Sequence, residues 1–346
     1  MIERFSLPLA DPLATADGTI ERREGFLVEY DHRGETGLGE ATPLPGWTES
    51  LDACERALSR ALDADGGHSA ALLTFDAGET PAARHGFATA LLDADARADG
   101  IPLCEWFEGS AHSSVPVNAT VGDADSEATA ERARAAVDAG FDCLKLKVGA
   151  RPVDADCDRL AAVREAVGDD VTLRADANGA WDPETAERAF ERFADYDVRY
   201  VEQPLPAENL AGHADLPGPV GVALDEALVA HSMQDVLDAG VADYLILKPM
   251  VLGGPGNAHT LAVRARDEGV EPVVTTTVDA VVARTAAVHV AAAIPDVAPC
   301  GLATGGMLAA DLGPDPAPVE DGRIRVPRGA GIGIDRSEID HGQGDP

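Results

Sequence analysis

The segment at residues 143–148, Cys-Leu-Lys-Leu-Lys-Val, constrains the fold and the chemistry of this chain more than any other. Apolar and cationic residues alternate in it, so a β-strand would place Lys145 and Lys147 on the same face. The 346 residues include only one further lysine, Lys248, against 24 arginines. Lysine differs from arginine in carrying a compact amine that can give and take a proton when burial lowers its pKa. We therefore interpret the lysines as groups kept for proton transfer; the alternative is a chance pair on a solvated strand.

Strand-like and helix-like segments alternate regularly from residue 115 onward. We predict β-strands at residues 115–118, 143–148, 171–176, 198–202, 222–225, 244–248, 272–276 and 299–303. Helical patterns lie between them, and Asp182-Pro183 marks one helix start with an N-cap and a proline at the first helical position. This alternation indicates parallel strands with right-handed crossovers, and eight of them close most economically into a TIM-type barrel. An open doubly wound sheet is the alternative, but no glycine-rich phosphate turn follows the first strand.

The N-terminal third follows a different, mixed α+β pattern. Helices are predicted at residues 49–62, with Thr48 as N-cap, and at 82–98. We therefore expect an α+β domain at residues 1–112 and a barrel domain at 113–320, followed by a terminal segment at 321–346.

Acidic residues close three consecutive predicted strands of the barrel. Asp176, Glu202 and Asp225 each end an apolar run, and lysines end the strands before and after them. In TIM barrels the C-terminal strand ends form the catalytic face, and neighbouring strands lie about 4.8 Å apart. Three carboxylates placed there can bind one hard cation, and an all-oxygen set favours Mg²⁺ over Zn²⁺. The alternative, that each acid only caps a helix or pairs with an arginine, suits one acid better than three in order.

Taken together, the motifs resemble those of the enolase superfamily, and within it the muconate-lactonizing subgroup. They are Lys145-Leu146-Lys147, Asp176-Ala177-Asn178-Gly179, Glu202-Gln203-Pro204, Asp225-Glu226 and Leu247-Lys248-Pro249. The resemblance covers nearly the whole chain. It implies an α/β fold, a modified TIM barrel of the (β/α)7β type with an N-terminal α+β capping domain, to which residues 321–346 would return. Members of this superfamily combine a lysine or histidine base with magnesium.

The resemblance also implies a role for each site residue. Lys147 would be the base that removes the α-proton, and Lys248 would stabilise the enediolate from the opposite side. Lys145 would tune Lys147 and contact the substrate carboxylate, with Asn178 close by. The implied ligands of Mg²⁺, or of Mn²⁺ in its place, are Asp176, Glu202 and Asp225.

Two cap segments, residues 22–25 and 39–47, are similar to the cap loops of o-succinylbenzoate synthases. This similarity implies Mg²⁺-dependent dehydration of 2-succinyl-6-hydroxy-2,4-cyclohexadiene-1-carboxylate to o-succinylbenzoate in menaquinone biosynthesis, through an enediolate. The alternatives from the same subgroup are an N-acylamino acid racemase, a dipeptide epimerase or a cycloisomerase, which would use the same lysines and metal. A barrel that has lost catalysis and serves as a binding scaffold is a third interpretation, and the retained lysines count against it. The loop at 39–47 has a plainer explanation too, as a proline-stiffened turn without substrate contact.

Two barrel segments bear on the substrate. Residues 275–280 stand where the family usually shows a serine-rich run ending in Glu-Ser, and we expect Thr276 and Thr277 to contact the substrate there. Residues 301–305 lack the Asp-x-Asp with which dipeptide epimerases of this subgroup bind a substrate ammonium. That absence counts against the epimerase.

The charge of the chain excludes several classes of partner. With 61 acidic and 27 basic residues, the net charge is −34, which repels nucleic acid and anionic membranes. A hydrophobic fraction of 45% still supplies a folded core. Many acids with almost no lysine indicate a halophilic protein, since molar salt screens repulsion beyond about 3 Å. We expect a small-molecule carboxylate as substrate, and leave self-association into a homo-oligomer open.

Cysteine usage and the apolar pattern predict a cytoplasmic protein. The five cysteines are odd in number and form no CxxC pair, which argues against a disulfide framework or a zinc knuckle. No basic region followed by an apolar run opens the sequence, and no apolar run reaches the roughly 18 residues of a membrane span.

If the acidity is an adaptation to salt, low ionic strength should destabilise the fold by unscreening repulsion among the surplus carboxylates. We expect the midpoint of thermal unfolding to rise between about 0.1 M and 2 M KCl. An unchanged midpoint across this range, followed by circular dichroism, would show that the charge has another explanation.

Overall fold

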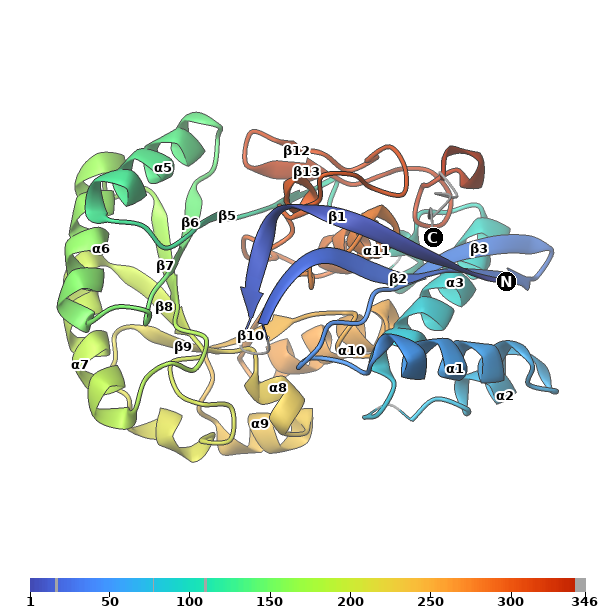
Figure 1. The fold of residues 1–346 in the computed structure, drawn as a ribbon, viewed down its shortest axis with the longest axis horizontal. Helices are drawn as coiled ribbons and strands as arrows, with labels where there is room; N and C mark the ends of the chain where they lie inside the picture. Colours follow the sequence, from blue (N-terminus) through green and yellow to red (C-terminus); the bar gives the residue numbers. More distant parts are fainter. Residues whose placement is uncertain (16–17, 77, 109–110, 340–346) are drawn as a thin grey trace.

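The computed structural model describes residues 1–15, 18–76, 78–108 and 111–339 (Figure 1). It contains a three-stranded antiparallel sheet near the N-terminus, a seven-stranded parallel sheet, and a small three-stranded sheet that includes late residues. Within these ranges, no helix has both the length and the apolar character needed to cross a membrane.

The N-terminal domain is an antiparallel sheet with helices packed against it. Its strands are β1 (Ile2–Thr15), β2 (Gly18–His32) and β3 (Glu35–Ala41), and its helices are α1 (Leu51–Leu62), α2 (Gly67–Leu72), α3 (Pro81–Asp99) and α4 (Leu103–Glu108). Helix α3 lies so close to β3 that a Cβ on Gly39 would stand 1.9 Å from the carbonyl oxygen of Gly86. Glycine is therefore required at this contact, which fixes β3 against the helix.

The two helices predicted in this domain are confirmed as α1 and α3, but the N-cap assigned to α1 is wrong. Ser50 caps the helix, because its hydroxyl accepts a hydrogen bond from the backbone N–H of Ala53. The hydroxyl of Thr48 instead accepts from the backbone N–H of Leu44, at 2.9 Å. Thr48 therefore stabilises the preceding turn and not the helix.

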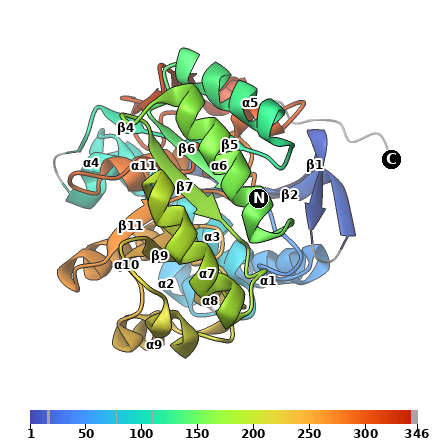
Figure 2. The same ribbon diagram turned by 90° about the vertical axis from the view of Figure 1, so that its left-hand side faces the viewer.

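The second domain is a parallel sheet in the order β11-β10-β9-β8-β7-β6-β5, in which every strand follows its neighbour in the chain. Its strands are β5 (Ala119–Val121), β6 (Cys143–Lys147), β7 (Thr172–Asp176), β8 (Val198–Glu202), β9 (Gly221–Leu224), β10 (Tyr244–Leu247) and β11 (Glu271–Val274). Its helices are α5 (Ser126–Asp138), α6 (Val153–Val167), α7 (Pro183–Phe193), α8 (Ala227–Ala230), α9 (Met233–Ala239), α10 (Pro255–Asp267) and α11 (Val281–Ala292). Helices α5, α6 and α7 form a row on the outside of the strands, as Figures 1 and 2 show.

The eighth position of the barrel is filled by a short extended segment. Cys300 forms a parallel bridge with Val117 on one side, and Gly301 forms one with Thr275 on the other. The strand predicted at residues 299–303 is therefore reduced to these two bridges. Pro299 has no backbone N–H and cannot contribute a donor to a longer ladder.

The strand predicted at residues 115–118 is also wrong in extent. Strand β4 (Ser114–Pro116) pairs antiparallel with β13 (Arg323–Arg325), which in turn pairs with β12 (Val319–Glu320). The first barrel strand is β5, which pairs with β6. Strand β13 is thus the antiparallel partner of β4, and a partner so distant in sequence could not be predicted from the local pattern. The (β/α)7β barrel with a capping domain is the fold that this structure shows.

Strand alternation separates an outer apolar face from an inner polar face. Leu144 and Leu146 are fully buried in the apolar cluster that includes residues of the outer helices. On the opposite face, Tyr200 lies two residues before Glu202 and packs in a small cluster with Ala223, Ile246 and Val273. This cluster fills the barrel beneath the strand ends, so polar groups at the ends rest on a packed core.

The residues after β13 lie against the N-terminal domain. The backbone N–H of Ile332 donates to the buried carboxylate of Asp93 in α3, at 2.7 Å. The guanidinium of Arg336 donates to Glu29 in β2. We propose domain limits at residues 1–112 and 113–320, with a C-terminal segment at 321–346 that returns to the cap; its last residues, 340–346, lie outside the described ranges.

A buried carboxylate links the cap to the barrel. Glu40, in β3, accepts hydrogen bonds from the backbone N–H groups of Ala280 and Ala283, each at 2.8 Å. It therefore caps helix α11, whose own N-cap residue, Ala280, has no side-chain oxygen. Burial and the nearby charge of Asp279 raise the pKa of Glu40 to about 7, although the hydrogen bonds it accepts oppose the shift.

The raised pKa of Glu40 predicts how the stability of the variant Glu40→Gln, relative to the wild type, changes with pH. A raised carboxyl pKa means that the folded state holds a proton which the unfolded chain has lost, so stability falls as pH rises toward the folded pKa. Relative to the wild type, Glu40→Gln should gain up to about 1.4 kcal/mol per pH unit between about pH 5 and 7. Urea unfolding across this range measures the difference. Glu35→Gln, on the exposed part of the same strand, is the control and should show no such trend.

Candidate active site

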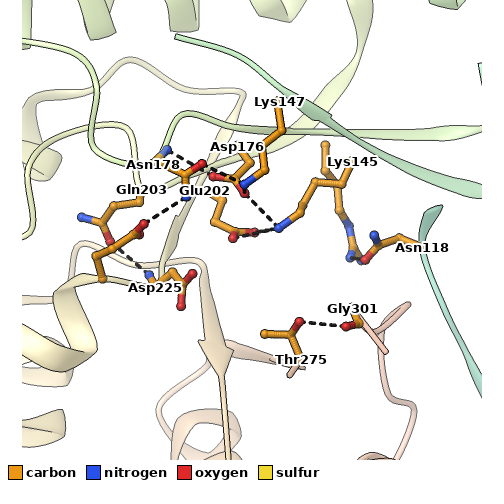
Figure 3. A network of polar contacts seen from close by, with 12 residues as sticks. Asn118, Lys145, Lys147, Asp176, Asn178, Glu202, Gln203, Asp225, Thr275 and Gly301 are labelled. Carbon is orange, nitrogen blue, oxygen red and sulfur yellow. Dashed lines mark hydrogen bonds and ion pairs between the residues drawn. The ribbon is translucent and has the colours of Figure 1, made fainter. Parts of the chain in front are cut away.

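Two lysines of β6 share one carboxylate at the end of β7. The Nζ atom of Lys145 lies 3.0 Å from Oδ2 of Asp176, and Nζ of Lys147 lies 2.7 Å from the same oxygen. Lys145 also contacts Oε1 of Glu202 at 2.9 Å (Figure 3). The register explains this arrangement, because Lys147 pairs with Asp176 and Asp176 with Glu202 across adjacent strands.

The third carboxylate pairs with the third lysine. Asp225 follows β9 directly and Lys248 follows β10 directly, and the ammonium of Lys248 donates to Oδ2 of Asp225. The indole ring of Trp47, from the cap, lies over the same ammonium, with its centroid 3.5 Å from Nζ. The cap therefore reaches the end of the barrel strands at this lysine.

All three carboxylates are buried. Asp176, Glu202 and Asp225 are 1%, 2% and 4% exposed. Burial and the charges of Asp176 and Asp225 raise the pKa of Glu202 to about 7, with Lys145 opposing. Burial likewise raises the pKa of Asp225 to about 6, although Lys248 opposes. Burial alone would also raise the pKa of Asp176, but Lys145 and Lys147 outweigh it and hold this pKa below its usual range.

The donor chemistry of this site suits a hard divalent cation. Side-chain oxygens from three adjacent strand ends accumulate negative charge out of water, which explains why the pKa of Glu202 rises. Across the described ranges, however, no three acidic, histidine or cysteine side chains form a compact group that could hold a metal. The lysine ammonium groups take the carboxylate oxygens, so Asp176 and Glu202 share Lys145 while Asp225 pairs with Lys248.

Asn178 connects Lys147 to a fourth carboxylate. Its Oδ1 accepts from Lys147 at 2.8 Å, and its Nδ2 donates to Oε1 of Glu226 at 3.0 Å. Asn178 has a φ of 45°, in the left-handed region that asparagine tolerates better than most residues. The turn after β7 thus aims this amide at the lysine.

Gln203 holds the backbone that presents Asp225. Its Oε1 accepts from the backbone N–H groups of Asp225 at 3.1 Å and Ala227 at 3.0 Å. Its Nε2 donates to the carbonyl of Leu205 at 2.9 Å. Gln203 also has a positive φ, 41°, which glutamine rarely adopts, so the strand end is shaped by these contacts.

The two threonines expected to contact substrate lie outside the lysine–carboxylate network that the structure describes. The hydroxyl of Thr276 is 2.8 Å from that of Thr304, which follows the eighth barrel segment. The hydroxyl of Thr277 donates to Asp279. Thr276 therefore joins the ends of neighbouring strands, and Thr277 is engaged next to the cap.

Sequence reasoning missed the contacts that four residues make at this site. Gln203 and Glu226 stand beside the carboxylates that the motifs singled out, and their positions next to those residues were the available signal. The loop that carries Trp47 was singled out, but its contact with Lys248 depends on how the cap sits on the barrel. The contact of Thr304 with Thr276 was missed for another reason, because the two residues follow different strands of the barrel.

Comparison with known proteins places the chain in a family. Residues 128–339 match the family described as "Enolase C-terminal domain-like". The chain belongs to the enolase superfamily. Residues 1–94 match a second family, described as "MenC, N-terminal domain". The chain is accordingly an enzyme of a superfamily that contains lyases and isomerases.

Relatives within the enolase superfamily differ in their activities. An o-succinylbenzoate synthase of Thermosynechococcus vestitus is 32% identical over 82% of this chain and 86% of its own length. A hydrophobic dipeptide epimerase of Enterococcus faecalis is 29% identical over 96% and 98%. A solved structure of a dipeptide epimerase from Enterococcus faecalis V583, complexed with Mg and the dipeptide L-Leu-L-Tyr, has a TM-score of 0.85 and 26% identity, covering 97% of this chain and 98% of that one. Sequence identity alone therefore does not separate a lyase from an epimerase.

Proposed function

We propose that this chain is a Mg²⁺-dependent lyase that dehydrates 2-succinyl-6-hydroxy-2,4-cyclohexadiene-1-carboxylate to o-succinylbenzoate in menaquinone biosynthesis. The observation that carries the proposal is the match of residues 1–94 to the MenC N-terminal domain. The cap provides Trp47 at the strand ends, and it contains both segments that resemble synthase loops. The barrel supports general-base chemistry at a carbon next to a carboxylate, which the lyase and its relatives share.

In the proposed reaction, Lys147 is the general base. Its side chain is 38% exposed, the most accessible of the three lysines in the site, and its Nζ is aimed by Asp176 and Asn178. The neutral amine takes the α-proton of the substrate, and the electron pair left behind forms the enediolate. Departure of the ring hydroxyl as water, with a proton returned to it, then creates the third double bond of an aromatic ring. Preorganised charge is the main source of stabilisation for such an intermediate.

The other two lysines contribute fixed positive charge. Lys248 is 11% exposed between Asp225 and Trp47, and we propose that it stabilises the enediolate from the side opposite Lys147. Lys145 is 16% exposed and held by Asp176 and Glu202. We propose that it tunes Lys147 through their shared carboxylate and contacts the substrate carboxylate. Thr276 and Thr277 remain proposed substrate contacts at the edge of the site.

Asp176, Glu202 and Asp225 are the proposed ligands of Mg²⁺, with Asn178 next to them. A bound divalent cation would supply positive charge at the substrate carboxylate, which makes the neighbouring proton more acidic. Mn²⁺ has a similar preference for oxygen ligands and could replace it.

Racemisation of an N-acylamino acid, with the related epimerase and cycloisomerase activities, is the second candidate. The presence of two lysines, Lys147 and Lys248, at different strand ends favours it, because racemisation needs a base on each face of the reacting carbon. The sequence at residues 301–305, Gly-Leu-Ala-Thr-Gly, lacks the paired aspartates expected of a dipeptide epimerase. For either activity we propose a small-molecule carboxylate as substrate. We also propose that the protein is halophilic and works in the cytoplasm.

Metal binding can be measured without activity. Mg²⁺ that binds only the folded state should raise the midpoint of thermal unfolding, by an amount that follows its concentration relative to its dissociation constant. We expect this rise in the wild type and not in Asp225→Asn, which should fold but lose activity. Asp195→Asn, an exposed position, is the matched control and should respond like the wild type. Full activity in a chelator-treated, metal-stripped sample would contradict the proposal.

Arginine substitutions separate the roles of the two catalytic lysines. Lys147→Arg keeps a cation but loses a usable base, so activity should fall by at least roughly 10²- to 10⁴-fold. Lys248→Arg keeps the charge and should retain more activity than Lys147→Arg. The assays are dehydration of the cyclohexadiene substrate and solvent deuterium exchange at the α-carbon of an N-succinyl amino acid. Efficient racemisation without detectable dehydration would favour the second candidate.

A further inference from the structure

The ammonium of Lys248 is enclosed by groups from both domains. Asp225 accepts its hydrogen bond from the barrel side, and the Trp47 ring covers it from the cap side at 3.5 Å. A cation over an indole face is attracted by the ring quadrupole, most strongly when both are partly removed from water. Trp47 is half-buried and the Lys248 side chain is almost fully buried. Their contact is therefore partly desolvated.

The turn that carries Trp47 is held by its own hydrogen bonds. The backbone N–H groups of Trp47 and Thr48 both donate to the carbonyl of Leu44, at 3.0 Å. The hydroxyl of Thr48 accepts from the N–H of Leu44, which closes the turn from the other side. The next residue, Glu49, accepts from the N–H groups at the start of α3. The indole therefore projects from a braced turn.

A buried arginine fixes this loop relative to the barrel. Arg23 is 2% exposed and donates to the carbonyl oxygens of Thr42 at 2.8 Å and Pro43 at 3.1 Å. Its Nε donates to the carbonyl of Val278, in the loop after β11, at 3.2 Å. Val278 has a φ of 62°, a strained conformation for a β-branched residue, which the surrounding contacts must impose. One guanidinium thus ties the cap loop to a barrel loop.

We propose that Trp47 is a positioning residue that holds the Lys248 ammonium over Asp225, so that this charge stands in a fixed place when substrate binds. The cap then contributes to the reaction through Lys248. The effect on catalysis rests on the proposed function, whereas the contact itself does not.

The kinetic test compares Trp47→Phe with Trp47→Leu. Phenylalanine keeps an aromatic face, so it should retain most of kcat, and leucine should lower kcat by roughly tenfold, between the values expected for an exposed and for a desolvated cation–π contact. Trp106→Leu, a partly exposed tryptophan in α4, is the matched control and should leave kcat unchanged. A rise in KM at constant kcat in Trp47→Leu would overturn the proposal, because it would mean uniform binding of substrate.

The spectroscopic test does not depend on activity. Replacement of Lys248 by Met removes the cation and should change tryptophan emission in the wild-type background. The same replacement in the Trp47→Phe background should leave the remaining emission unchanged. An identical change in both backgrounds, or none in either, would overturn the contact. If emission couples Trp47 to Lys248 but no dehydration of the cyclohexadiene is found, the proposed function fails and the positioning role stands.

Discussion

The ammonium of Lys145, shared between Asp176 and Glu202, is the interaction on which the rest of the site depends. Two carboxylates on adjacent strands inside a barrel would repel one another and resist ionisation if no cation lay between them. Lys145 supplies that cation from the next strand, at 3.0 and 2.9 Å. The pair of acids can then stay at the strand ends, and Lys147, whose side chain is the most exposed of the three lysines, lies beside them.

Sequence alone could predict the parts of this structure that follow from local periodicity. The alternation at residues 143–148 indicated which residues share a face, and the acids at three strand ends indicated where polar groups gather. Segments that depend on distant partners were not predictable. Residues 114–116 pair with β13, near residue 324, and not with a barrel strand, and the contact of Trp47 with Lys248 needs the docked cap.

The cap and the barrel are linked through buried polar groups, which cannot form hydrogen bonds to water in place of their partners. Glu40 caps a barrel helix, and Arg23 binds carbonyl groups of both domains. A buried donor or acceptor that loses its partner costs stability, so these links hold the relative placement of the domains more firmly than exposed ion pairs would. That rigidity is what allows a cap residue to act on a barrel lysine.

The short eighth segment leaves the barrel with two parts: a continuous arc of strands from β5 to β11, and a weak joint at Cys300 and Gly301. Among the described residues, single bridges join Cys300 to Val117, just before β5, and Gly301 to Thr275, just after β11, whereas β6 and β7 share a continuous ladder. In the order β11 to β5, the strands that carry the lysines and acids occupy the continuous arc, centred across the ring from the joint. Opening of the barrel should therefore be easiest at this joint, away from the lysines and carboxylates but next to Thr276, a proposed substrate contact.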